Sequence, residues 1–220
     1  MLLAIETSTD YGSIAIGRGA DLIGEVVIGA RSRHAESLLP ALDFLLRTSR
    51  LSRSDVRGVV VGAGPGSFTG VRVAAATALG LATGLDVPLF AYSSLACLAV
   101  ETAAESRVCA AFDARRGEVY AACFERVANR DQLTTIFAPE ALHVDELRSR
   151  ITGMNVMCVG DGARRYADAL GIAAPPPSFP RAAGLLRLAA ADPGAGLIED
   201  RTGWEPMYLR SSGAERGIAG

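Results

Sequence analysis

A glycine-rich segment in the first half of the chain carries residue types that can hold a phosphate group. Residues 62–70 read Gly-Ala-Gly-Pro-Gly-Ser-Phe-Thr-Gly and lie between a β-branched run and an alanine-rich stretch. A turn of this kind exposes backbone N–H groups at the start of a helix, where anions bind. Gly64, Gly66 and Ser67 are therefore candidate phosphate contacts. The segment lacks the lysine of a Walker loop, so a tight strand-to-helix turn without a ligand is the alternative interpretation.

A hydroxyl-rich turn follows the first apolar run. Glu6-Thr-Ser-Thr9 stands between two short β-rich runs, and its hydroxyl groups can hydrogen-bond a phosphate. Thr7, Ser8 and Thr9 are therefore candidate phosphate contacts, although Glu6 stands where such turns usually have Asp. An ordinary hydrogen-bonded turn explains the same residues at least as well.

Two turns in the second half of the chain are also polar. Val159-Gly-Asp-Gly162 opens a helix after a strand, which suits either an adenosine or phosphate contact or a plain turn. Asp113-Ala-Arg-Arg-Gly117 is a hairpin turn with two cations, and a solvated turn is its simplest interpretation.

The sequence predicts no catalytic residues and no metal site. Its two histidines, His34 and His143, belong to no HExxH motif, and the cysteines form no CxxC pair. All 22 basic residues are arginine, which excludes a P-loop lysine, a Schiff-base lysine and a lysine general base. We expect the cysteines to be buried small hydrophobes in a reducing compartment. They are Cys97, Cys109, Cys123 and Cys158.

The composition is that of a globular protein that does not grip nucleic acid by itself. Half of the 220 residues are hydrophobic, and the formal net charge is -2, whereas nucleic-acid binding usually needs a basic face. The opening MLLAIETST turns polar too early for a signal peptide and predicts a first strand. The apolar stretch Val71–Ala91 is interrupted by Arg72, Asp86 and Pro88, so it predicts no membrane span. We expect a cytoplasmic protein.

The elements of the first half alternate between strands and helices. Leucines at helical spacing predict a helix at 38–46, and small residues predict a second helix at 69–85. A third helix is expected at 93–104. Short β-rich runs predict the strands, at 2–5, 13–17, 24–28, 57–61 and 86–91. The order βββαβαβα predicts an α/β fold, a mixed sheet with helices packed on it.

After residue 104 the pattern restarts in a reduced form. Strands at 107–113 and 118–125 form a hairpin, and a further strand is expected at 156–160. Helices are expected at 139–151, 163–171 and around 181–191, followed by a tail that is loop-like apart from 206–210. We therefore expect two related α/β subdomains, at 1–104 and 105–220, of which the second is reduced and returns its last residues to the first.

The predicted second helix has an unusually smooth surface. Small residues recur along it, which allows another helix to approach closely. They are Ala74, Ala75, Ala76, Ala78, Gly80, Ala82 and Gly84. Close packing on its own sheet and a flat interface with a second protein are equally good interpretations, and both can hold for opposite faces.

Several motifs together resemble the TsaB (YeaZ) family. They occur in the order of that family and span almost the whole chain. They read His34-Ala-Glu-Ser-Leu-Leu-Pro40, Gly64-Pro-Gly-Ser-Phe-Thr-Gly-Val-Arg72, Val87-Pro88, Ser93-Ser-Leu95, Asp113-Ala-Arg-Arg-Gly-Glu-Val-Tyr120 and Pro206-Met-Tyr-Leu-Arg210. The resemblance implies the actin-like (ASKHA) fold, with two related mixed-sheet subdomains.

The resemblance also implies a non-catalytic role. TsaB is similar to the catalytic subunit TsaD, which carries a His-x-x-x-His metal pair, and the matching positions here are Ser94 and Leu98. Leucine cannot coordinate a metal, and serine is a poor replacement for imidazole. The family's role is to bind and organise TsaD, with the ATPase TsaE, for transfer of threonylcarbamoyl onto the adenosine beside the anticodon of tRNA.

The resemblance places the partner interface on the first two helices. The candidate contacts with TsaD are His34, Ser37, Leu38, Ala41, Leu45, Arg72, Val73, Ala76, Thr77 and Gly80. Arg115 and Arg116 are candidate contacts with TsaE or tRNA. No tightly bound cofactor is expected, with ATP or ADP a candidate at the interface with TsaD. Alone, the chain is a candidate homodimer that meets tRNA only within the complex and contacts no membrane.

Three other functions remain as alternatives. A small actin-like kinase would need two intact phosphate loops, and both loops here depart from the pattern. A peptidase would need a metal pair or a nucleophile–base pair, and the sequence has neither. A nucleotide-binding module without a fixed partner is the third, and heat protection by ATP alone would favour it.

Overall fold

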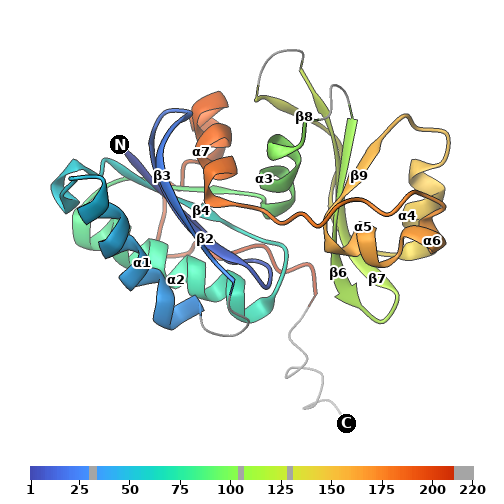
Figure 1. Cartoon of the computed structure of the whole chain (residues 1–220), viewed down its shortest axis with the longest axis horizontal. Coiled ribbons are helices and arrows are strands. Elements are labelled where there is room, and N and C mark those ends of the chain that lie inside the picture. The colour runs from blue at the N-terminus through green and yellow to red at the C-terminus, as the bar shows by residue number, and fades with distance from the viewer. Residues whose placement is uncertain (30–33, 104–106, 128–130, 211–220) are drawn as a thin grey trace, which may run out of the picture.

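The chain forms two lobes, each built on one mixed β-sheet (Figure 1). The computed structural model describes residues 1–29, 34–103, 107–127 and 131–210. The first sheet has the order β3-β2-β1-β4-β5, in which β1 pairs antiparallel with β2 and parallel with β4. Its strands are β1 (Leu2–Glu6), β2 (Gly12–Arg18), β3 (Asp21–Ile28), β4 (Gly58–Gly62) and β5 (Leu89–Tyr92).

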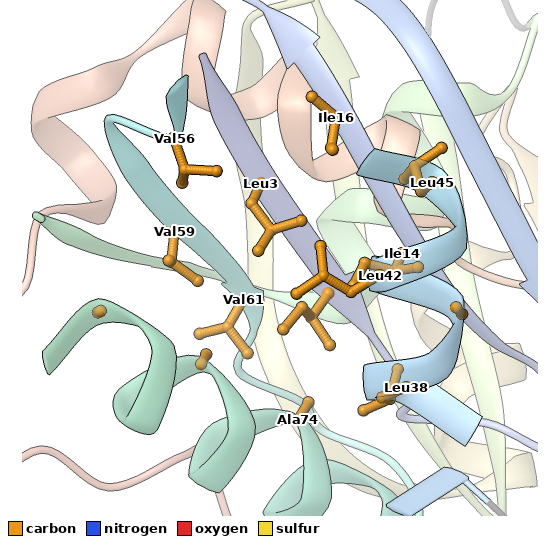
Figure 2. Close-up of a cluster of buried hydrophobic side chains, with 14 of the residues drawn as sticks. Leu3, Ile14, Ile16, Leu38, Leu42, Leu45, Val56, Val59, Val61 and Ala74 are labelled. Carbon is orange, nitrogen blue, oxygen red and sulfur yellow. The ribbon is translucent and has the colours of Figure 1, made fainter. Parts of the chain in front are cut away.

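Helices cover both faces of the first sheet because its central strands are apolar on both sides. Leu3 and Ile5 of β1 face α1 (His34–Thr48) and α2 (Phe68–Leu85), together with Val59 and Val61 of β4 (Figure 2). Alternate residues of β1, β2 and β4 face the other way, toward α3 (Ser94–Glu101) and α7 (Ala182–Ala191). They are Ala4, Ala15 and Val60. A short 3-10 turn, η1 (Arg53–Asp55), precedes β4.

The second sheet repeats the topology of the first without its fifth strand. Its order is β8-β7-β6-β9, with antiparallel pairs β6–β7 and β7–β8 and a parallel pair β6–β9. Its strands are β6 (Arg107–Arg115), β7 (Glu118–Arg126), β8 (Leu133–His143) and β9 (Met157–Val159). α3 packs on one face, and the other face carries α4 (Val144–Ile151), α5 (Asp161–Arg165) and α6 (Ala167–Leu170).

The matching strand orders confirm the predicted α/β fold of two related mixed-sheet units, of which the second is reduced. The boundary expected between residues 104 and 105 lies outside the described residues. After the second sheet, the chain crosses back so that α7 packs on β1 and β2 of the first lobe (Figure 1). A short helix, α8 (Pro193–Gly196), follows.

The helix predicted at 139–151 is wrong in its first five residues. β8 continues through Pro139 to His143, with Leu142 paired to Val119. A proline is tolerated there because β8 is an edge strand, where a missing N–H costs no ladder bond on the open side. α4 starts only at Val144, where the His143 ring accepts a hydrogen bond from Asp145 N at 3.4 Å.

Two other predicted helices differ in extent. The helix expected at 163–171 is two short helices, α5 and α6, divided at Tyr166. α3 ends at Glu101 rather than at 104. Among the described helices, α2 is long and apolar enough to cross a membrane, judged by length and composition alone. Its buried residues pack on the first sheet, as those of a core helix do.

The return of α7 to the first sheet should contribute strongly to stability. Leu185 lies fully buried in the cluster that joins α7 to β1 and β4. We expect Leu185→Ala to lower the free energy of unfolding by about 2–5 kcal/mol, because it removes buried methyl groups and leaves a cavity. Leu22→Ala on β3, where the side chain is 50% exposed, should change it by less than about 0.5 kcal/mol. Urea unfolding of both variants measures the difference, and equal losses would contradict this account.

Candidate functional site

A buried carboxylate joins the two turns that were predicted to bind phosphate. Glu6 ends β1 and is fully buried. Its carboxylate accepts hydrogen bonds from Ser8 N at 2.6 Å and from Ser94 Oγ at 2.8 Å. Ser94 Oγ in turn accepts one from Gly64 N at 3.2 Å. β1, the glycine-rich turn and the start of α3 are thus tied to one side chain.

The two turns also pack directly on each other. Ser67 N donates to the Ser8 carbonyl at 2.7 Å, and Thr7 Oγ1 donates to the Gly70 carbonyl at 2.6 Å. A Cβ atom at Gly66 or Gly70 would collide with the carbonyl oxygens of Ser8 and Thr7. The glycines therefore allow close contact between backbones, and several of the groups expected to bind phosphate already bind the protein.

A polar cleft of about 280 Å³ lies where the two turns face the second lobe. It brings together Ser8, Thr9, Gly66 and Ser67, whereas Thr7 and Gly64 do not line it. The Oγ atom of Ser8, a residue only 2% exposed, has no hydrogen-bond partner among the residues that the structure describes. The second lobe contributes Phe112, Asp113, Ala114, Arg115, Tyr120 and Asp161.

The charges around this cleft oppose phosphate binding. Asp10, Asp113 and Asp161 line it against one cation, Arg115. Asp113 accepts hydrogen bonds from Arg115 N at 2.9 Å and from Arg165 Nη1 at 3.0 Å, which hold it in place. Burial, with Asp113 nearby, raises the pKa of Asp161. Carboxylates repel the oxygens of a metal-free nucleotide, so the residues present do not fit its phosphates inside this chain's own cleft.

The segment 206–210 bridges the two lobes beside the cleft. Met207 N donates to the Ala63 carbonyl at 2.8 Å in the first lobe, and Arg210 Nη1 donates to the Ala114 carbonyl at 3.0 Å in the second. Between them, the Tyr208 hydroxyl lies 3.2 Å from Arg72 Nε. The motif found at the end of the sequence is therefore a link between the lobes.

Figure 1 shows α1 and α2 side by side on the outer face of the first lobe. On α2, the predicted contacts Arg72, Ala76 and Gly80 are exposed, and Val73 and Thr77 are half-buried. A groove of about 330 Å³ runs between the two helices, where Gly80 and Gly84 face α1 residues. The small residues of α2 thus leave an open surface beside α1.

The predicted contacts on α1 need a correction. Leu38, Ala41 and Leu45 are buried in the core, because the leucine stripe faces the sheet (Figure 2). Ser37 is half-buried, and the side chain of His34 lies outside the described residues. The outer face of α1 instead carries Leu39, which is 55% exposed, and Phe44, which is 57% exposed. Large apolar residues off the stripe were the signal that sequence reasoning missed.

Comparison with known proteins decides the family. A family model for TsaD, tRNA N6-adenosine threonylcarbamoyltransferase, matches residues 28–169. The tRNA threonylcarbamoyladenosine biosynthesis protein TsaB of Escherichia coli K12 is 34% identical over 174 residues, which cover 76% of this chain and 74% of that protein. The chain belongs to the TsaB (YeaZ) family.

Other TsaB relatives and a solved structure agree. TsaB of Haemophilus influenzae is 35% identical over 76% of this chain and 74% of its own length. TsaB of Bacillus subtilis is 37% identical over 56% of this chain and 55% of its own. YeaZ of Pseudomonas aeruginosa superposes with a TM-score of 0.81 at 30% identity, covering 94% of this chain and 99% of that one.

In this TsaB family member, Ser94 and Leu98 have structural surroundings. Ser94 is fully buried and bonded to Glu6, and Leu98 is buried in the cluster between α3 and the second sheet. Among the described residues, no group of three His, Cys, Asp or Glu side chains is placed to hold a metal ion. Arg115 lines the cleft, and Arg116 lies exposed in the same hairpin turn.

The contact between the two turns should make Gly70 intolerant of a side chain. We expect Gly70→Ala to lower the free energy of unfolding by about 1–3 kcal/mol, because its Cβ would push against the Thr7 carbonyl. Gly80→Ala on the same helix meets open space and should raise it by up to about 1 kcal/mol through helix propensity. Thermal or urea unfolding measures both changes, and a loss at both glycines would leave the contact without support.

The buried Glu6 should also produce a pH dependence. Burial raises the pKa of Glu6 above its ordinary 4.5, so the folded chain holds this proton to higher pH than the unfolded chain does. Its stabilising effect is complete below that ordinary value and is lost as the pH rises through the raised pKa. We expect the unfolding free energy to fall less steeply with rising pH in Glu6→Gln than in the wild type. Glu199→Gln, at an exposed position, should keep the wild-type slope, and parallel curves for Glu6→Gln would refute the assignment.

Proposed function

We propose that the chain acts in the synthesis of threonylcarbamoyladenosine on tRNA, as a non-catalytic subunit that binds and organises a TsaD homologue. The observation that carries the proposal is the exposed face of α1 and α2, where Leu39 lines the groove beside Gly80 and Gly84, and Phe44 is a second exposed apolar residue of α1. Large exposed apolar side chains beside a smooth groove are typical of a protein–protein interface. The TsaB relatives are named for this biosynthesis, which supports the same role here.

The surroundings of Ser94 and Leu98 support a role without catalysis. These positions match the metal-binding histidines of TsaD, yet here one side chain ties Glu6 and the other fills the core. Neither is free to bind a metal or a substrate. The carbamoyl transfer then belongs to the TsaD partner, and the ATPase TsaE and the tRNA join only in the complex, which we place in the cytoplasm.

The acidic cleft supports a nucleotide site outside this chain alone. Since the cleft does not fit ATP or ADP, we place any bound nucleotide at the interface with the TsaD homologue. Without that partner, the apolar face of α1 and α2 remains uncovered, and we expect two copies of the chain to pair through it.

A small actin-like nucleotide-binding protein or kinase is the second candidate, favoured by the cleft between two lobes. The two functions differ in what the isolated chain binds. Calorimetry with ATP and a magnesium salt should give no saturable heat if the subunit role is correct. Tight binding by the chain alone would favour the second candidate.

The interface makes a mutational prediction. We expect Ala76→Arg and Gly80→Arg to weaken association with the TsaD homologue of the same organism by at least about thirtyfold, since a bulky charge in the centre of an interface costs about 2 kcal/mol or more. Calorimetry or light scattering measures the affinity, and the reconstituted tRNA modification should fall with it. Both residues are exposed, so both variants should fold.

A matched control is available on the second lobe. Ile136 on β8 is also an exposed apolar residue, and Ile136→Arg should leave the affinity unchanged. Wild-type affinity in Ala76→Arg and Gly80→Arg would exclude this face. No association of the wild type, with or without nucleotide and TsaE, would exclude the subunit role itself.

A further inference from the structure

Three of the four cysteines stand in a row across the second sheet. Cys109 on β6 is the register partner of Cys123 on β7 and of Cys158 on β9. All three are reduced and belong to the core cluster on the face covered by α4–α6. Neighbouring strands of a sheet lie about 4.7–4.9 Å apart, which is within the roughly 4.4–6.8 Å between Cα atoms that a disulfide spans. Cys109 is therefore within disulfide reach of either neighbour.

The outer cysteine of the row borders an open groove. β9 is an edge strand, since within the described part of the chain the second sheet has no counterpart of β5. A groove of about 860 Å³ runs along it, lined by Val156, Cys158 and Ile172 among others, but not by Cys109 or Cys123. Val156 and Ile172 also pack against the cluster that holds the cysteine row. A small molecule in the groove thus has its shortest path to the row at Cys158.

The three thiols differ in acidity. A hydrogen bond from Cys109 lowers the pKa of Cys158, because it stabilises the thiolate. The same bond, together with burial, raises the pKa of Cys109. Burial raises the pKa of Cys123 to about 11. Since thiolates are the reactive form, the lowered pKa of Cys158 and the groove beside it both favour Cys158 as the reacting thiol of the row.

We propose that Cys158 is a site of oxidation by hydrogen peroxide and that Cys109 resolves it as a disulfide. The Cys158 thiolate attacks one peroxide oxygen, the O–O bond breaks, and hydroxide leaves, so sulfur becomes a sulfenic acid while peroxide is reduced. Cys109 Sγ then attacks Cys158 Sγ, the S–O bond breaks, and water leaves with the Cys109 proton. Two thiols and one peroxide give one disulfide and two waters.

The arrangement favours a dithiol over a metal site. The row is linear, with Cys109 in the middle, and no three His, Cys, Asp or Glu side chains of the described chain converge on a common centre. Cys97 offers an internal reference, because it lies in a different cluster, and its thiol bonds the Arg181 carbonyl at 3.0 Å. Its burial raises the pKa of its thiol.

The sequence makes the test direct. Without lysine, trypsin cuts only after arginine, which places the four cysteines in separate peptides. These peptides are 73–107, 108–115, 117–126 and 151–164. After brief treatment of the folded chain with hydrogen peroxide and alkylation, mass spectrometry should find 108–115 joined to 151–164, two hydrogens lighter than their sum. We expect Cys158 to oxidise at least about tenfold faster than Cys97.

Variants separate the two steps. Cys109→Ala should leave a sulfenic acid on 151–164 that dimedone traps, whereas Cys158→Ala should lose both products. Cys123→Ala is the matched control and should keep the disulfide. The proposal is wrong if peroxide leaves the yields of the alkylated peptides 108–115 and 151–164 unchanged. It is also wrong if Cys97 oxidises as fast as Cys158. If a variant fails to fold, the wild-type yield of the disulfide-linked peptides relative to the alkylated ones still tests whether the disulfide forms.

Discussion

The buried carboxylate of Glu6 is the interaction on which the first lobe depends. Placing a charge in the core is costly unless hydrogen bonds compensate for the lost water. Here a backbone N–H and the Ser94 hydroxyl offset part of that cost, and burial still raises the pKa of Glu6. A Cβ atom at Gly62 would overlap this carboxylate, so the last residue of β4 must be glycine. One polar group on β1 thus determines residue types on two other elements, β4 and α3.

This constraint also explains why the two turns that were predicted to bind phosphate bond to the protein instead. In a nucleotide-binding cleft, their N–H and hydroxyl groups must point at the ligand. Here Ser67 N, Thr7 Oγ1 and Ser8 N point at other parts of the same lobe. The second lobe adds carboxylates rather than compensating cations. The two-lobed frame is thus held at its centre by internal hydrogen bonds, while α1 and α2 present an exposed outer face.

Much of the first sheet could be predicted because its strands are short apolar runs separated by clear turn residues. β8 could not, because polar residues and Pro139 on an edge strand look like the start of a helix. The leucine stripe of α1 correctly predicted a helix, but a stripe does not tell whether the sheet or a partner covers it. Leu38 and Leu45 face the sheet.

Contacts between distant residues left no local signal. Glu6 and Ser94 are 88 positions apart, and neither residue type predicts the hydrogen bond between them. The cysteine row is equally hidden, since Cys109, Cys123 and Cys158 share no spacing, and only the register of the strands aligns them. Glycines were more informative, because the crowded positions Gly66 and Gly70 lie inside the motif that the sequence already distinguished.

The link formed by residues 206–210 connects two properties that would otherwise be separate. Tyr208 touches Arg72 on α2, while Arg210 holds the hairpin of the other lobe. A hinge motion that widened the cleft would have to pull on the same α2 residue that lies at the outer helical face. A protein seated on that face would therefore bind one opening angle better than another, and would select it in proportion to that preference. Binding on the outer helical face and opening of the cleft would then be coupled through residues 206–210.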